Sequence, residues 1–164
     1  MTAAATGLTA RVIRPDDFDK ASLGATTDQF FIDGESTQGR VSMVGHVIAP
    51  RSLAAPMHWH EREDEFSFVM SGQVAAISGG TEVLARPGEL LVKPRGEWHT
   101  FWNPGDEPAT LLEIISPAGL EKLFRSFAAG EPTPEALMAM AAEYGCQVDF
   151  AATMQLATSR GLGM

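Results

Sequence analysis

The sequence is poor in cysteine and in basic residues. Cys146 is its only cysteine, so no disulfide can form within the chain and a cysteine-rich zinc site cannot be built from one chain. Twelve Lys and Arg stand against 21 Asp and Glu, which gives a formal charge of -9 at pH 7. A surface of this sign repels phosphate backbones and anionic lipids. We therefore expect neither nucleic acid nor a membrane as a partner, and a reducing cytoplasm as the location.

Long apolar runs and a targeting signal are missing as well. No run approaches the length of a membrane span, and residues 1–8 lack the basic start and apolar stretch of a secretory signal peptide. With 164 residues, 45% of them hydrophobic, the chain is typical of one globular domain with a core. Residues 1–9 are small and polar without periodicity, which predicts a flexible N-terminal arm.

Short segments rich in β-branched and aromatic residues, separated by Gly and Pro, fill the next part of the chain. This spacing predicts an all-β sandwich or barrel over residues 10–116. Within it, Gly79-Gly80 can supply the positive φ angles of a tight hairpin turn. The expected strands are 39–48, 65–70, 73–78, 82–85, 90–92, 100–103 and 110–115.

After Ile115 the pattern becomes helical. Ser116-Pro117 and Thr133-Pro134 each place an N-cap residue before a proline, and apolar residues then recur at helical spacing. We predict two C-terminal helices over residues 117–150 that pack on the barrel, the second of them capped by Gly145. Residues 151–164 are expected to be a short tail.

Three histidines and one glutamate form a candidate metal site. His58 and His60 stand two residues apart, and on a strand such residues share a face, so both imidazoles can reach one point. Glu65 opens the next strand-like run, and His99 follows a Pro/Gly turn that would fix its ring. Three neutral imidazoles and a carboxylate suit one divalent transition metal, Fe, Ni, Co, Mn or Zn, with one or two positions left open.

The same residues resemble the two motifs of the cupin superfamily. The first, H-x-H, four residues, E, six residues, G, is matched by His58, His60, Glu65 and Gly72. The second, G, five residues, P-x-G, two residues, H, three residues, N, is matched by Gly88, Pro94, Gly96, His99 and Asn103. The likeness covers roughly residues 36–145 and is most similar to single-domain, quercetin-dioxygenase-like cupins. It implies a double-stranded β-helix, or jelly-roll barrel, and a homodimer.

Inward positions should follow the ligands at every second residue of the same strands. The residues expected on this basis to line a substrate pocket are Ser67, Val69, Phe101 and Asn103. Phe101 could instead fill the core. His46 lies on an expected strand outside both motifs, and we expect it to have a structural role.

Outward positions on the Glu65 strand are apolar. Phe66, Phe68 and Met70 are too apolar for solvent, so they should meet the helices or a partner chain.

The ligand set and the family likeness favour a metal-dependent oxygenase acting on a small enolic or phenolic, flavonol-like substrate with dioxygen. The resemblance, and not the spacing, implies a second, catalytic role for Glu65 as the base that takes the hydroxyl proton. Two alternatives stay open because cupins look alike across chemistries. One is a non-oxidative isomerase, cyclase or dehydratase, which oxygen consumption would distinguish. The other is a small-molecule-binding module without catalysis.

Overall fold

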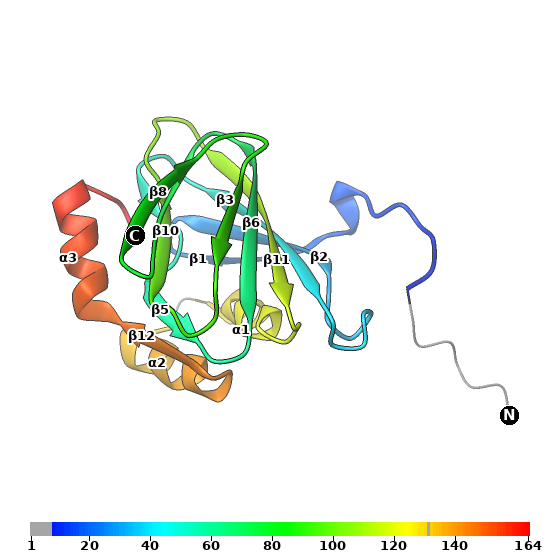
Figure 1. Ribbon diagram of the computed structural model, residues 1–164. Helices are drawn as coiled ribbons and strands as arrows, with labels where there is room; N and C mark the ends of the chain where they lie inside the picture. Colours follow the sequence, from blue (N-terminus) through cyan, green and yellow to red (C-terminus); the bar gives the residue numbers. More distant parts are fainter. Residues whose placement is uncertain (1–7, 131) are drawn as a thin grey trace, which may run out of the picture.

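Two antiparallel sheets face each other and enclose the interior of the protein, with helices at one end and along one side (Figure 1). The computed structural model describes residues 8–130 and 132–164. Most of the predicted flexible arm, residues 1–7, lies outside the described residues. The all-β jelly-roll fold predicted from the sequence is confirmed.

The first sheet has the strand order β1-β2-β3-β11-β6-β9. Its strands are β1 (Asp19–Leu23), β2 (Thr26–Ile32), β3 (Ser42–Ile48), β11 (Ala109–Ser116), β6 (Asp64–Ser71) and β9 (Leu90–Lys93). The second sheet has the order β12-β5-β10-β7-β8, and β4 pairs with β10 beside it. Its strands are β12 (Cys146–Asp149), β5 (Met57–His60), β10 (His99–Asn103), β7 (Val74–Ser78), β8 (Thr81–Ala85) and β4 (Ser52–Leu53).

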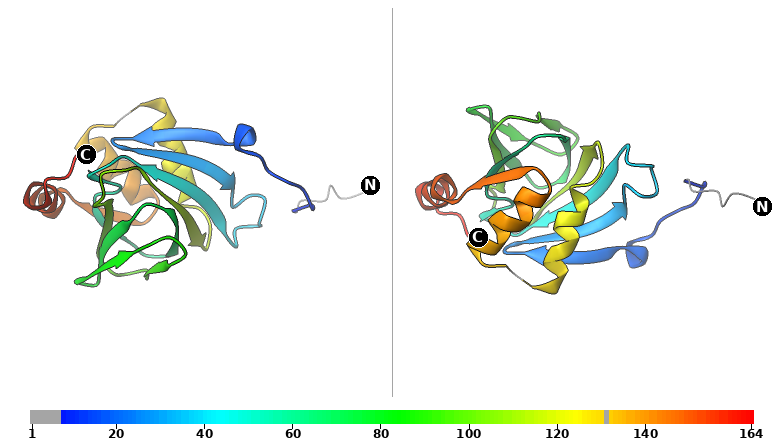
Figure 2. Two further views of the ribbon diagram at one scale, coloured as in Figure 1. Left: turned by 90° about the horizontal axis from the view of Figure 1, so that it is seen from above. Right: turned by 90° about the horizontal axis from the view of Figure 1, so that it is seen from below.

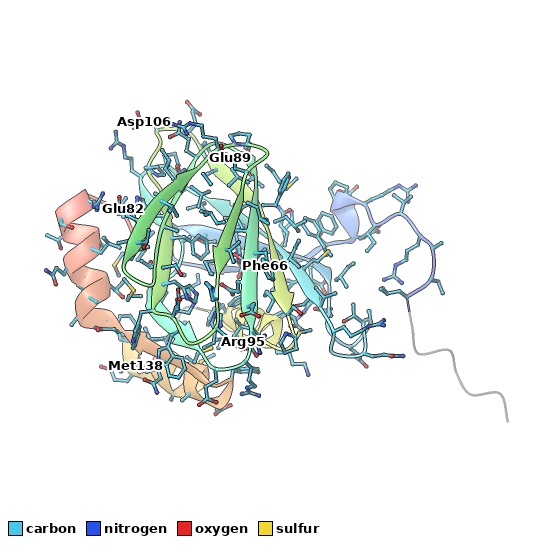
Figure 3. All side chains as sticks on the ribbon, viewed as in Figure 1. Phe66, Glu82, Glu89, Arg95, Asp106 and Met138 are labelled. Atoms are coloured by element: carbon cyan, nitrogen blue, oxygen red, sulfur yellow. The ribbon has the colours of Figure 1, made fainter. Side chains whose placement is uncertain are left out.

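Helices cover one end of the barrel and one side. Seen from below in Figure 2, α1 (Glu121–Ser126) and α2 (Pro134–Glu143) lie across the end of the barrel, joined through the 3₁₀ helix η2 (Phe127–Ala129). Helix α3 (Phe150–Arg160) runs along the second sheet, where Arg160 donates to Glu82 of β8 at 2.8 Å (Figure 3). Another 3₁₀ turn, η1 (Pro15–Asp17), precedes β1. No described helix combines the length and the apolar character that crossing a membrane would need.

The C-terminal region differs from the sequence expectation in three respects. Residues 146–149, expected within the helical region, form β12, which pairs with β5. Ser116 still belongs to β11, where it pairs with Asp64 of β6, so it caps no helix and α1 begins only at Glu121. Residues expected as a tail form a third helix, α3, whose N-cap Asp149 accepts a hydrogen bond from the Ala152 N–H at 2.9 Å. The second predicted helix start is confirmed, because the Thr133 hydroxyl accepts a hydrogen bond from the Ala136 N–H at 3.3 Å.

A row of polar side chains crosses the inner face of the first sheet and separates two apolar clusters. Strand β11 shows the pattern, because its inward residues run from Leu111 in one cluster through buried Glu113 to Ile115 in the other. Strand β3 does the same with Val44, His46 and Ile48. We call this row the polar layer; its members are Asp28, His46, Glu65, Ser67, Lys93 and Glu113, each at most 5% exposed.

Candidate metal centre

The four predicted metal ligands converge on one point at the edge of the polar layer. His58 and His60 come from β5, His99 from β10 and Glu65 from β6, and their ligand atoms all lie within 4.8 Å of one another. His58 and His99 face each other directly in the β5–β10 pair. The Glu65 carboxylate lies 3.6 Å from Nε2 of His60 and 3.5 Å from Nε2 of His99, which is too far for good hydrogen bonds. The arrangement therefore leaves donor atoms close together but not bonded to one another.

The backbone fixes which nitrogen of each imidazole faces the cluster. Nδ1 of His58, His60 and His99 lies 2.7–2.9 Å from the carbonyl oxygen of Pro56, Glu63 and Glu97, respectively. A ring nitrogen beside a carbonyl oxygen donates its proton to it, so the lone pair belongs to Nε2. Nε2 of His60 and of His99 is buried without a hydrogen-bond partner. Since an unpaired buried acceptor costs free energy that a cation would recover, the residues present fit a metal ion.

Two of the motif glycines act through their backbone conformation. Gly96 has a φ of 75° and donates its N–H to the His60 carbonyl oxygen at 2.9 Å, which ties the turn before His99 to the strand that carries His60. Gly72 has a φ of 71°, and a Cβ there would lie 2.8 Å from Cα of Ala109. Only glycine adopts such a conformation without strain and fits such a gap. These turns set how the ligand-bearing strands meet.

A buried lysine balances the charge beside the metal ligands. Lys93 is 1% exposed, and its Nζ lies 2.8 Å from Oε2 of Glu65 and 2.7 Å from Oε2 of Glu113. The Ser67 hydroxyl donates to the same Glu113 oxygen at 2.8 Å, and the ammonium group lies 4.1 Å from the centre of the Phe101 ring. Sequence reasoning missed Lys93 and Glu113. The alternation along β9 that makes Leu91 inward-facing would have made Lys93 inward-facing as well.

The pKa directions agree with a site for a cation. Burial and the neighbouring His99 lower the pKa of His58 well below its ordinary value. Although burial opposes it, Lys93 and the two nearest imidazoles hold the pKa of Glu65 well below its ordinary value. The pKa of His60 is raised by Glu65 despite burial. Glu65 is thus a carboxylate and His58 a neutral imidazole at neutral pH, the forms that bind metals.

A cavity of about 70 Å³ borders the cluster. His58 and Glu65 lie in its wall together with apolar side chains of α2, of α1 and of the residue before α1, among them Leu120, Leu123, Phe124, Leu137 and Ala141. The remaining polar side chains of the wall are Thr26, Asp28, His46 and Glu113. An apolar cavity of ~150 Å³ holds a benzene molecule, so a ligand with one ring would fit here only if the helices move outward.

The four residues expected to line a substrate pocket lie in different surroundings. Phe101 is part of the cavity wall. Ser67 is bonded to Glu113, and Val69 belongs to the apolar cluster on the far side of the polar layer. The Asn103 amide donates to three backbone carbonyls, at Ile48, Ala49 and Glu107, and accepts from the Gly105 N–H. His46, for which we expected a structural role, also lies in the cavity wall.

The fold and the cluster together define a class: a jelly-roll barrel with three imidazoles and one carboxylate turned toward one interior point. Residues 46–115, which run from within β3 to the end of β11, match the family model of the cupin domain. This match and the jelly-roll fold support a place in the cupin superfamily. The quercetin-dioxygenase-like subtype stays a prediction.

Relatives of known name share this domain over part of their length. The chain is 34% identical over 122 residues to the rhicadhesin receptor of Pisum sativum, which covers 70% of this chain and 55% of the receptor. It is 28% identical over 74 residues to the tetracenomycin polyketide synthase protein TcmJ of Streptomyces glaucescens, covering 45% of this chain and 50% of TcmJ. The chain thus spans about half the length of these relatives.

Solved structures support the fold. A predicted oxalate decarboxylase from Thermotoga maritima superposes with a TM-score of 0.61 at 18% identity, covering 65% of this chain and 99% of that protein. The nucleoside dehydratase Pac13 of Streptomyces superposes with a TM-score of 0.56 at 13% identity, covering 70% and 88%. At these identities the likeness concerns the barrel and not its chemistry.

Proposed function

We propose that this chain is a metal-dependent oxygenase that acts on a small enolic or phenolic molecule. One observation carries the proposal: two of the four candidate ligands, His58 and Glu65, form part of the wall of an otherwise largely apolar cavity. A molecule in that cavity would lie beside the ligand cluster. A divalent transition metal held by His58, His60, Glu65 and His99 would supply a positive charge that stabilises an oxyanion.

The chain's own side chains would bind and orient this molecule. Phe101 and Phe124 are aromatic surfaces on the wall, suited to a planar ring. The apolar residues of α1 and α2 keep bulk water from the cluster, which strengthens electrostatic interactions there. Because the cavity is about 70 Å³, a single-ring enol or phenol, which needs less outward movement of α1 and α2, suits it better than a flavonol.

The role of Glu65 as the base is weakened by its surroundings. The family resemblance implies that this residue both binds the metal and takes a proton. Here Lys93 occupies one carboxylate oxygen at 2.8 Å and lowers the pKa of the group. A carboxylate held in this way suits the ligand role better than proton transfer.

Oxygen uptake tests the proposal. Purified protein loaded in turn with Fe(II), Ni(II), Co(II), Mn(II) or Zn(II) would be given catechols, cyclic enediols and flavonols in an oxygen-electrode cell. We expect one metal per chain and oxygen consumption that needs both metal and substrate, with His99→Ala as the inactive control. Equal turnover without oxygen would contradict an oxygenase.

Anaerobic turnover would instead favour a non-oxidative isomerase, cyclase or dehydratase. A specific observation makes this the second candidate: the cavity wall contains a histidine, His46, and proton transfer by such a group is the central step of these reactions. Metal binding with no turnover of any tested substrate would leave a small-molecule-binding cupin.

A further inference from the structure

His46 and Asp28 form a buried pair on the wall of the cavity, away from the metal ligands in sequence. They face each other across β2 and β3, and Nδ1 of His46 lies 2.7 Å from Oδ1 of Asp28. Both are buried, at 5% and 4% exposure, and both line the cavity. The Asp28 carboxylate therefore pairs with Nδ1 of the His46 ring.

The other nitrogen of His46 has no such partner. Because Asp28 accepts the Nδ1 proton, Nε2 carries the lone pair, and among the described residues no hydrogen bond reaches Nε2. The ring lies between Phe101 and Phe124, with centroid distances of 5.9 and 5.8 Å, so apolar contacts hold its orientation. A purely structural buried histidine would be expected to pair both of its nitrogens. This one keeps a proton acceptor free at the cavity.

The charges around His46 strengthen it as a base. Two carboxylates, Asp28 and Glu113, act on it from the neighbouring strands, and Lys93 acts in the opposite sense from β9. Although burial opposes it, the carboxylates raise the pKa of His46. A base whose pKa lies near the working pH transfers protons most effectively.

We propose that His46, oriented by Asp28, is a further catalytic residue: the base that takes a proton from a hydroxyl of the molecule in the cavity. This inference rests on the proposed function. In the step, the hydroxyl O–H bond breaks, its electron pair stays on oxygen, and the proton forms a new N–H bond at Nε2. Asp28 then stabilises the imidazolium. The ligand class this predicts has two neighbouring oxygens, as in a catechol or an enediol, one for the metal and one for His46.

The test uses 4-nitrocatechol, a probe whose absorbance reports its ionisation, with zinc-loaded protein, which is redox-inert. In the wild type we expect the bound probe to lose a proton at lower pH than the free probe, and ¹⁵N NMR to show that proton at Nε2 of His46. In His46→Gln the pH midpoint for ionisation of the bound probe should rise by about one unit or more. Asp28→Asn, which keeps the imidazole, should raise it by less.

Controls separate this inference from the proposed function. Phe124→Leu, a change in the same cavity wall without a proton site, should alter probe affinity but not where the proton resides. Zinc content should be one ion per chain in every variant; loss of zinc from the wild type would defeat the proposed function itself. Normal zinc content with an unchanged midpoint in His46→Gln would overturn only the role of His46. The same conclusion follows if NMR finds Nε2 unprotonated in the wild-type complex. If the zinc-loaded wild type leaves the probe unbound, the ligand class inferred here is overturned together with the proposed substrate class.

Discussion

The two sheets contribute to the site in different ways. The second sheet supplies three imidazoles, and each is oriented by a carbonyl oxygen of its own nearby backbone, as for His60 and Glu63 at 2.9 Å. The first sheet supplies the charges, and these are held by one another across strands, as for Lys93 with Glu65 and Glu113. The histidine half of the site, His58, His60 and His99, thus depends on local backbone geometry. The charged half, Glu65, Lys93 and Glu113, depends on ion pairing between residues far apart in sequence.

The difference predicts that the two halves respond to different perturbations. Removing an imidazole should remove a metal ligand and leave the barrel intact, because it breaks one local hydrogen bond to a backbone carbonyl oxygen and leaves no buried charge unpaired. Removing a member of the charged half should destabilise the fold, because its partners would remain buried as uncompensated charges.

Lys93→Met should have the largest effect on stability. It leaves Glu65 and Glu113 buried without a cation, and breaking a buried pair in this way costs about 3–5 kcal/mol. Urea unfolding in the presence of EDTA would measure the loss, and a saturating divalent metal should offset part of it. The matched control is Arg95→Gln at the end of the barrel (Figure 3), which breaks an exposed pair with Asp64 and should cost no more than about 1 kcal/mol. Equal losses of unfolding free energy in both variants would contradict the difference between the buried and the exposed ion pair.

His99→Ala should have the largest effect on metal binding. Loss of a hydrogen-bonded partner of a ligand already weakens metal affinity by about 10–100-fold, so loss of the ligand itself should exceed that. Calorimetric titration with Zn(II) would measure the affinity. His46→Asn, which changes the one histidine outside the cluster, should bind zinc as the wild type does. A comparable loss of zinc in both variants would show that the cluster is not the binding site.

The pH dependence of metal uptake should come from the histidine half. The raised pKa of His60 means that this imidazole holds a proton below that pKa, and a metal must displace it. Affinity should therefore rise with pH by up to about tenfold per unit below the pKa of His60 and level off above it. His58, with its lowered pKa, should release none. Calorimetric metal titrations at pH 6 and pH 8, in buffers of different ionisation enthalpy, would count the protons released on metal binding. Equal numbers of protons at the two pH values would contradict an origin at His60.

The smallest effect on stability is expected outside both halves, on the outer face of the first sheet. Phe68, Met70, Leu90 and Val92 are 40–54% exposed there, so the helices do not cover them, and the homodimer implied by the family likeness is still a prediction. Phe68→Ser should change the free energy of unfolding of the monomer by no more than about 0.5 kcal/mol. If two copies pair through this face, sedimentation should show the variant as a monomer and the wild type as a dimer. If the variant and the wild type are both dimers, the interface lies elsewhere on the surface.

The sequence revealed the histidine half of the site and Glu65, and it concealed the rest of the charged half, for a physical reason. His58, His60, Glu65 and His99 are recognisable because their spacing to nearby turns is fixed along the chain. The pairs Ser67–Glu113 and Asp28–His46 join residues that are 46 and 18 positions apart, and only strand pairing reveals them. His46 alone gave no sign that its neighbour would be a carboxylate.

Weak local sequence patterns explain why strands β1 and β2 and helix α3 were not predicted. Strand β1 was missed because it contains no β-branched or aromatic residue, and β2 because Asp28 and Gln29 interrupt its β-branched and aromatic residues. Helix α3 has an N-cap, Asp149, and a left-handed C-cap, Gly161. Its face is made largely of small residues such as Ala157, so the apolar periodicity that identified the second helix was weak.

Anomalous diffraction from a Co(II)-loaded crystal tests the central claim most directly. We expect a single strong peak per chain, about 2.0–2.2 Å from Nε2 of His58, His60 and His99 and from a Glu65 oxygen, with Lys93 still bound to Glu113. A peak bound elsewhere on the chain, or none at a saturating cobalt concentration, would contradict it.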